Sequence, residues 1–317
     1  MIALEDIITC KSYHNLCDFQ YDAPNLDHIP PTGVVHVPLD QIERFFQRIE
    51  GNGHTYVVVS SCSDFGLAYQ EEHPPWKDMI KWIHMQVNPS LGYNGVQQPP
   101  RLVPETCHPS DRYSVKCHSY TRATFPYIPE NIHHWFVSNL MIKGDDRLTA
   151  IPFGIAEGKD KLVHGMQPTD EDKWLDRKCE TYVSWQDYTA ERYELREWLH
   201  GFEGFTIRKP GDPQPYANYL KSLKEHRYVI SPPGNGCDCY RTMEALYMGA
   251  AVLVESTVTN KLLGLPINYY FDKTDILEYT DIDFGVNLIN NSLPEQIERV
   301  KLSYWRDQIE EKRKEIV

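Results

Sequence analysis

Gly234 and Gly236 precede an arginine and a glutamate in the segment "PPGNGCDCYRTMEAL". Glycine lets a backbone approach a ligand closely or adopt a positive φ. Asp238 can cap a helix that begins after it, and Arg241 then lies in the first turn of that helix. Free backbone N–H groups, the helix dipole and a guanidinium together bind a diphosphate. Glu244, one turn later, can accept hydrogen bonds from ribose hydroxyls, so the spacing predicts a nucleoside diphosphate site.

Two other phosphate-binding motifs do not fit this segment. The lysine and hydroxyl of a P-loop are absent, and the dinucleotide-binding fingerprint would require a third glycine at Cys239. ATPase and dehydrogenase functions therefore lose support. The simpler alternative is an ordinary strand, turn and helix in which Arg241 and Glu244 form an exposed ion pair.

The segment belongs to an alternation of strands and helices that begins near residue 179. Strands are predicted in "CETYVSW", "FEGFTIRK", "RYVIS" and "AAVLVE", and helices in "TAERYELREWL", "PYANYLKSLKEH" and "CYRTMEALYMG". This order predicts a parallel sheet covered on both faces, with ligands at the carboxyl ends of its strands.

The first half of the chain shows fewer elements. "TYVVVSSCSD" is a strong strand candidate, and "HHWFVSNLM" and "LTAIPFGIAEG" are shorter ones. The charged segment from residue 157 to 178 has no clear periodicity and is the best candidate for a linker. "SLPEQIERVKLSYWRDQIEEKRKEI" predicts one long amphipathic helix at the end of the sequence.

Several of these segments resemble the exostosin-like glycosyltransferases and their bacterial and viral relatives. "HRYVISPPGNGCDCYRTMEALYMGAAVLV" resembles their "PxGxGxDxxRxxEALxxG" signature, which is followed by a "xPVVx" strand. "WFVSNLMIKGDDRLTAIPFGIA", "TYVSWQDYTAERYELREWL" and "GLPINYYFDKTDIL" are similar to further blocks of the family. The matched blocks run from about Trp135 to Leu277. Cys239 stands where the family usually has threonine.

The resemblance implies an α/β fold of the GT-B type, with two Rossmann-like domains facing across a cleft. Residues 1–156 would form the acceptor-side domain, 157–293 the donor-binding domain, and 294–317 a helix that returns to the first domain. Arg241 and Arg192 would neutralise the donor diphosphate and Glu244 would hold the ribose. Gly234, Asn235 and Gly236 would bring backbone close to the sugar or phosphate.

Glycosyl transfer requires a stabilised leaving diphosphate and a base that deprotonates the acceptor hydroxyl. Asp64 follows the predicted strand "TYVVVSSC", where the family often has an aspartate, and is the predicted base. A helix cap or loop residue is the simpler interpretation of Asp64, and His108, His118 and His134 are the alternatives. The resemblance implies an inverting reaction without a bound metal or other cofactor.

Two groups of residues suggest a metal site only weakly. Asp281 and Asp283 form an Asp-x-Asp pair, which a metal-dependent GT-A enzyme would need, but it follows the last matched strand. "CHPSDRYSVKCH" offers two Cys-His pairs, whose spacing is not a familiar zinc motif.

The composition of the chain restricts the kinds of binding partner and the cellular compartment that we expect. The 32 basic and 45 acidic residues give a net charge of −13, and no run of lysine or arginine favours duplex nucleic acid. The first residues do not resemble a signal peptide, no apolar run is long enough for a transmembrane segment, and the eight scattered cysteines suit a reducing compartment. We therefore expect a cytoplasmic protein.

The sequence thus predicts a glycosyltransferase that uses a nucleotide-sugar donor and a glycan or glycoconjugate acceptor. A non-catalytic module that binds carbohydrate or nucleotide is the alternative from another class. A glycosyltransferase that acts on modified DNA bases is a third possibility, which the acidic balance disfavours.

Overall fold

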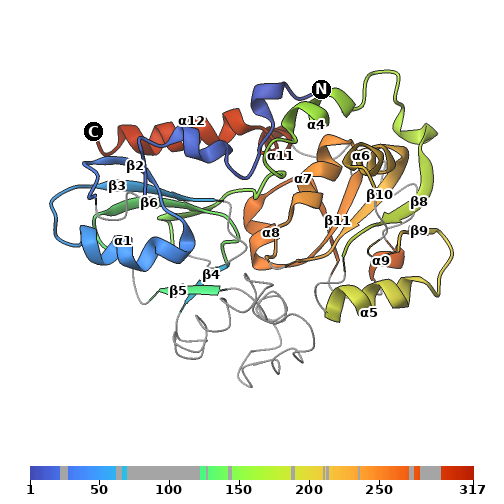
Figure 1. The fold of residues 1–317 in the computed structure, drawn as a ribbon, viewed down its shortest axis with the longest axis horizontal. Helices are drawn as coiled ribbons and strands as arrows, with labels where there is room; N and C mark the ends of the chain where they lie inside the picture. Colours follow the sequence, from blue (N-terminus) through green and yellow to red (C-terminus); the bar gives the residue numbers. More distant parts are fainter. Residues whose placement is uncertain are drawn as a thin grey trace.

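The structure is a computed structural model of the 317-residue chain, and it describes residues 1–21, 28–61, 66–69, 122–125, 128–141, 145–186, 190–209, 211, 214–234, 236–270, 275–278 and 294–317. Within these residues the chain forms two five-stranded sheets and one two-stranded sheet (Figure 1). Neighbouring strands are parallel throughout. The predicted α/β fold with two Rossmann-like halves is confirmed.

The first sheet has the order β1-β2-β3-β6-β7 and the second the order β12-β11-β10-β8-β9. The strands of the first sheet are β1 (Phe19–Gln20), β2 (Gly33–His36), β3 (Tyr56–Ser60), β6 (Ile132–Val137) and β7 (Leu148–Ala150). Those of the second are β8 (Lys178–Val183), β9 (Phe205–Ile207), β10 (His226–Ser231), β11 (Ala251–Glu255) and β12 (Asn268–Tyr270). The short pair is β4 (Gly66–Tyr69) with β5 (Arg122–Phe125).

Helices cover these sheets, and short 3-10 turns join them. The α-helices are α1 (Ile42–Ile49), α4 (Asp160–Met166), α5 (Ala190–Leu199), α6 (Tyr216–Glu225), α7 (Tyr240–Tyr247), α8 (Val258–Leu263), α9 (Asp275–Glu278), α11 (Pro294–Glu298) and α12 (Leu302–Lys314). The 3-10 turns are η1 (Leu4–Asp6), η2 (Ser12–Leu16), η4 (Leu39–Gln41) and η8 (Trp174–Asp176). The predicted linker thus contains a helix, α4, whose Val163 is buried in the core.

The central strands β10 and β11 of the second sheet are buried along their whole length, as their apolar residues predict. Alternate residues of β10 and β11 belong to two different hydrophobic clusters. Val229 and Val252 lie in a cluster with residues of α6 and α7, whereas Ile230 and Leu253 lie in one with residues of α5. Helices α6 and α7 therefore cover one face of this sheet and α5 the other (Figure 1). The first of these clusters also contains the buried strands of the first sheet, so one continuous core joins the halves.

The two sheets meet through segments that follow their strands. Thr259 in α8, beyond β11, donates a hydrogen bond of 2.8 Å to the carbonyl of Leu140, beyond β6. Parallel sheets that face each other through their carboxyl edges are the arrangement expected of a GT-B fold.

Both ends of the described chain attach to the same place. The Tyr247 hydroxyl in α7 accepts a hydrogen bond from the backbone N–H of Ile8 at 2.8 Å and donates one to the carbonyl of Val300 at 3.0 Å. Farther on, α12 packs against β2, β3 and β6 of the first sheet, where Trp305 and Ile309 are buried (Figure 1).

The single long C-terminal helix predicted from the sequence is wrong. The chain forms α11 and α12, and Lys301 between them is extended, with φ −102° and ψ 140°. Lys301 forms an antiparallel bridge with Ile7, and Val300 accepts the hydrogen bond from Tyr247. These contacts with distant residues take the backbone out of the helical conformation.

Gly154, in the segment that follows β7, packs against the N-terminal segment. Its φ is +80°, and an added Cβ would lie 2.7 Å from the carbonyl oxygen of Ile8. The backbone of Ile155 donates to that same carbonyl at 2.8 Å, and Cys10 donates to the carbonyl of Ile155 at 2.9 Å. Glycine is therefore required here for both conformation and space.

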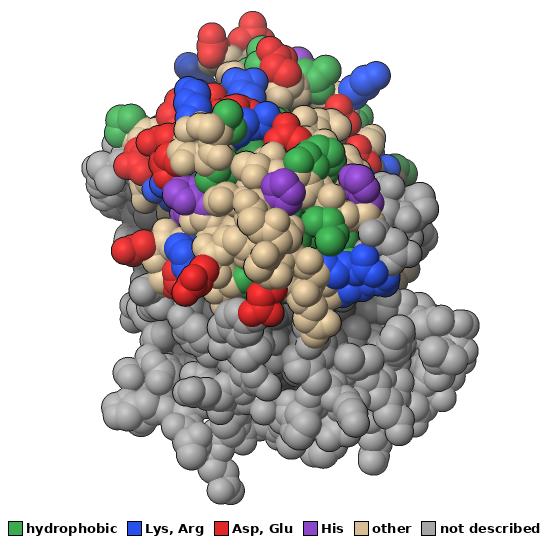
Figure 2. Space-filling view, turned by 90° about the vertical axis from the view of Figure 1, so that its left-hand side faces the viewer, with side chains coloured by type: hydrophobic (Ala, Val, Ile, Leu, Met, Phe, Trp, Pro, Cys, Tyr) green, Lys and Arg blue, Asp and Glu red, His purple; other side chains and the backbone are tan. Residues whose placement is uncertain are grey.

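The side of the first half drawn in Figure 2 shows Lys and Arg side chains among Asp and Glu side chains, without a broad basic area. Of the helices that the structure describes, none has the length and apolar character to cross a membrane.

Candidate functional site

The candidate site is built around residues 232–239, called the glycine turn, which lead from β10 to α7. Neither Gly234 nor Gly236 has a positive φ, so conformation does not explain them. A Cβ at Gly234 would lie 2.9 Å from Arg192 Nη2, and one at Gly236 would lie 2.6 Å from Asn139 Nδ2. The glycines are needed because side chains of the protein itself pack against the turn. Asn235 lies outside the described residues.

Arg192, in the first turns of α5, fixes the first part of the glycine turn. Its Nε donates to the carbonyl of Pro233 at 2.7 Å and its Nη2 to the carbonyl of Pro232 at 3.0 Å. The residue is 5% exposed. Arg192 thus adds a positive charge next to the turn while its guanidinium holds the backbone in place.

Arg241, in the first turn of α7, differs from Arg192 in its contacts. Its Nε and Nη1 atoms are buried and have no hydrogen-bond partner among the described residues. The guanidinium carbon lies 6.0 Å from the ring centroid of Trp185, which follows β8, and Arg241 makes no ion pair with any residue in the described ranges. Buried N–H groups of a cation normally find an acceptor. An anion beside α7 would supply one.

Glu244 is buried and its carboxylate contacts two tyrosines of α6. The hydroxyls of Tyr216 and Tyr219 donate to Oε1 and Oε2, each at 2.8 Å. Burial raises the pKa of Glu244, while the two tyrosine hydroxyls and Arg241 act to lower it. The exposed Arg241–Glu244 ion pair considered above is not present, and a ribose would have to share the carboxylate with the tyrosines.

Asp238 does not cap α7 as the sequence predicted. The residue at the N-cap is Cys239, and the Asp238 carboxylate instead accepts a hydrogen bond of 2.7 Å from the backbone N–H of Phe153, in the first half. The backbone N–H of Asp238 donates to Asn139 Oδ1, also in the first half, at 2.8 Å. Asp238 thus connects the glycine turn to the segments that follow β6 and β7.

The buried Asp238 carboxyl predicts a pH-dependent effect of Asp238→Asn. Burial raises the pKa of Asp238 from 3.8 to about 6, so the folded state binds the extra proton between these values. The stability that this carboxyl contributes is present below pH 4 and is lost as the pH rises through 6. Asparagine does not titrate and retains an acceptor for the N–H of Phe153. The difference in unfolding free energy between variant and wild type should therefore grow by about 2 kcal/mol, in favour of the variant, between pH 4 and pH 7.

Urea unfolding at a series of pH values measures this difference. A difference that stays constant from pH 4 to pH 7 would show that Asp238 titrates normally in the folded protein.

At the carboxyl edge of the first sheet the structure brings together side chains that the sequence did not single out. His36, at the end of β2, lies with Nε2 3.1 Å from Ser61 Oγ, and its ring centroid is 3.7 Å from that of His14. Burial and the neighbouring His14 lower the pKa of His36 to about 3. The valine-rich segment "GVVHV" is the sequence pattern that could have indicated β2 and placed His36 at its end.

The predicted base Asp64 lies outside the described residues, as do His108 and His118. Ser60 and Ser61, shortly before Asp64, lie at the carboxyl end of β3. His134 is not at this edge, because it is the third residue of β6, where its Nε2 lies 2.9 Å from Thr149 Oγ1.

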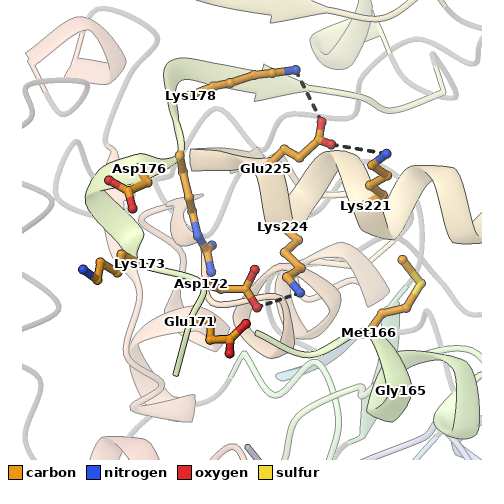
Figure 3. Close-up of a pocket in the computed structure, with 11 residues that line it drawn as sticks. Gly165, Met166, Glu171, Asp172, Lys173, Asp176, Lys178, Lys221, Lys224 and Glu225 are labelled. Carbon is orange, nitrogen blue, oxygen red and sulfur yellow. Dashed lines mark hydrogen bonds and ion pairs between the residues drawn. The ribbon is translucent and has the colours of Figure 1, made fainter. Parts of the chain in front are cut away.

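A pocket of about 650 Å³ lies elsewhere on the second half (Figure 3). Lys178, the first residue of β8, is 3.4 Å from Glu225, which is also 3.7 Å from Lys221, and Lys224 is 2.9 Å from Asp172. This pocket is at the amino end of β8, whereas ligands of parallel α/β sheets bind at the carboxyl ends. The three lysines named above are also already paired with carboxylates of the protein, so we place the candidate site at the glycine turn.

The described residues contain no group of three or more His, Cys, Asp or Glu side chains that could hold a metal ion. The Cys107–His118 segment and the Asp281–Asp283 pair lie outside the described residues.

Comparison with known proteins gives distant structural similarities only. The GtfA/B complex matches with a TM-score of 0.40 and 10% identity over 89% of this chain, which spans 57% of the matched chain. CalG4, the calicheamicin glycosyltransferase, matches with a TM-score of 0.36 and 12% identity over 88% of this chain and 74% of its own. No protein-family model and no curated protein matches the sequence.

Proposed function

We propose that the chain is a glycosyltransferase that moves a sugar from a nucleotide-sugar donor to a hydroxyl of a glycan or glycoconjugate. The observation that carries the proposal is the Arg241 guanidinium in the first turn of α7, whose buried Nε and Nη1 have no hydrogen-bond partner among the described residues. The amino end of this eight-residue helix, whose N-cap residue Cys239 makes no side-chain capping hydrogen bond, adds a second attraction for an anion. A diphosphate between them would satisfy both.

The neighbouring residues support the same assignment. Arg192 would hold the glycine turn in shape and contribute a second positive charge to the donor site. Gly234, Asn235 and Gly236 would present backbone to the phosphate or sugar. Glu244, oriented by its two tyrosines, would accept a ribose hydroxyl through lone pairs that the tyrosines leave available.

In the proposed reaction the acceptor oxygen attacks the anomeric carbon of the donor sugar. The bond from that carbon to the diphosphate oxygen breaks, and its electron pair leaves with the diphosphate. Asp64, as the proposed base, takes the proton of the acceptor hydroxyl. Arg241, Arg192 and the α7 N-terminus stabilise the charge that develops on the leaving group. We propose an inverting reaction with no metal in this role.

A thermal-shift screen against UDP, GDP, CDP, ADP and their common sugar conjugates tests the proposal. A ligand that binds only the folded state and is present at one hundred times its Kd stabilises the protein by about 2.7 kcal/mol. We expect one nucleotide base to give a clear shift. Folded protein with no shift across the panel would contradict a nucleotide-sugar donor.

A non-catalytic binding module is the second candidate, because Arg192 and Glu244 already have protein partners. Release of free nucleoside diphosphate from the donor that binds, with or without an acceptor, distinguishes the two. A module would bind the nucleotide and release none.

A further inference from the structure

Asn139, the second residue after the end of β6 in the first half, has an unusual environment. It is the only non-glycine residue in the described ranges with a positive φ, 56°, and its side chain is fully buried. Asparagine tolerates this left-handed conformation better than most residues, but a fully buried one usually has a specific contact to make.

Two contacts of Asn139 are with the glycine turn. Its Oδ1 accepts the hydrogen bond from the backbone N–H of Asp238, and its side chain occupies the space beside Gly236 that a Cβ would need. The Asp238 carboxylate returns to the first half by accepting from the N–H of Phe153. Asn139 and Phe153 of the first half therefore hold the end of the turn nearest α7. Arg192, which belongs to the second half, holds the beginning of the turn.

We infer that Asn139 is a positioning residue for the donor site, so that the first half sets the shape of the glycine turn and the affinity for the donor diphosphate. The inference rests on the proposed function. The N–H groups at the start of α7 can point at a phosphate only if Asp238 and the backbone before it keep their orientation. The Asn139 Oδ1 atom is the acceptor that fixes the backbone N–H of Asp238.

Asn139→Gly is the sharpest variant, since glycine accepts the positive φ and only the side chain is lost. Thr259→Val is the matched control. It removes another buried hydrogen bond between the halves, from Thr259 Oγ1 to the carbonyl of Leu140, without touching the glycine turn.

Two measurements on the full chain test the inference. The first is the Kd for whichever of UDP, GDP, CDP or ADP binds the wild type. We expect Asn139→Gly to raise it about tenfold, as for the loss of one buried hydrogen bond, and Thr259→Val to leave it within about twofold. The second is hydrogen–deuterium exchange of residues 232–241 in the unliganded protein, which should be faster in Asn139→Gly than in Thr259→Val at equal overall stability.

Equal Kd values for Asn139→Gly and wild type, or equal losses in both variants, would overturn the positioning role. If the wild type binds none of the nucleotides, the proposed function fails. The exchange measurement still decides whether Asn139 holds the turn, because it requires no ligand.

Discussion

Arg241→Ala is expected to weaken binding of the donor nucleotide at least about 100-fold. The wild-type guanidinium has two buried N–H groups without partners in the described structure, and in the proposed site both donate to the diphosphate. A hydrogen bond between charged groups contributes about 1.5–3 kcal/mol, so losing two of them reaches at least this factor.

The same substitution should change the unfolding free energy of the unliganded protein by less than about 1 kcal/mol. The contact with Trp185 is lost, but the cost of burying unpartnered N–H groups disappears with it. Isothermal titration and urea unfolding measure the two effects separately. Arg306→Ala, in an exposed pair with Asp307, is the control and should bind as the wild type does. Nucleotide affinity that survives in Arg241→Ala would place the diphosphate elsewhere.

Gly154→Ala should destabilise the protein by about 4 kcal/mol, a large part of the total stability of an ordinary domain. The new Cβ would lie 2.7 Å from the Ile8 carbonyl oxygen and 2.9 Å from the carbonyl carbon of Thr9, which are backbone atoms. Alanine must also adopt a φ of +80°. Overpacking against backbone and left-handed strain each cost about 1–3 kcal/mol.

Gly158→Ala separates the cost of the positive φ from the cost of overpacking against the backbone. Gly158 has a φ of +71°, but an added Cβ would meet no atom within 4 Å, so only the conformational cost of about 1–2 kcal/mol applies. Urea unfolding midpoints of the two variants give the comparison. Similar losses in both would mean that the N-terminal segment moves away from Gly154 without cost.

The fold of the second half could be predicted because its signals are local. The segments that form β8, β9 and β10 were each predicted as a strand followed by a helix, and the parallel sheet follows from that order. The first half was harder to predict, since β2 has only four residues and β1 two. The break between α11 and α12 has no local signal, because Ile7 and Tyr247 cause it.

The candidate site likewise combines features that local sequence patterns indicate with contacts that depend on distant residues. The residue types at the glycine turn indicated phosphate chemistry, and the buried Nε and Nη1 of Arg241 have no hydrogen-bond partner among the described residues. The partners of the other residues could not be read from spacing. Asp238 bonds to Phe153 and Asn139, and Glu244 to Tyr216 and Tyr219, all of which are far away in the sequence.

The position of α12 affects the order in which the two halves can be completed during synthesis. All five strands of the second sheet lie between residues 178 and 270, so that sheet can form once this stretch has left the ribosome. The first sheet is made earlier, but Trp305 and Ile309, which cover one of its faces, are made only after the whole second sheet. The half that is synthesised first is therefore the half that is finished last, and it exposes an apolar sheet face to the cell in the meantime.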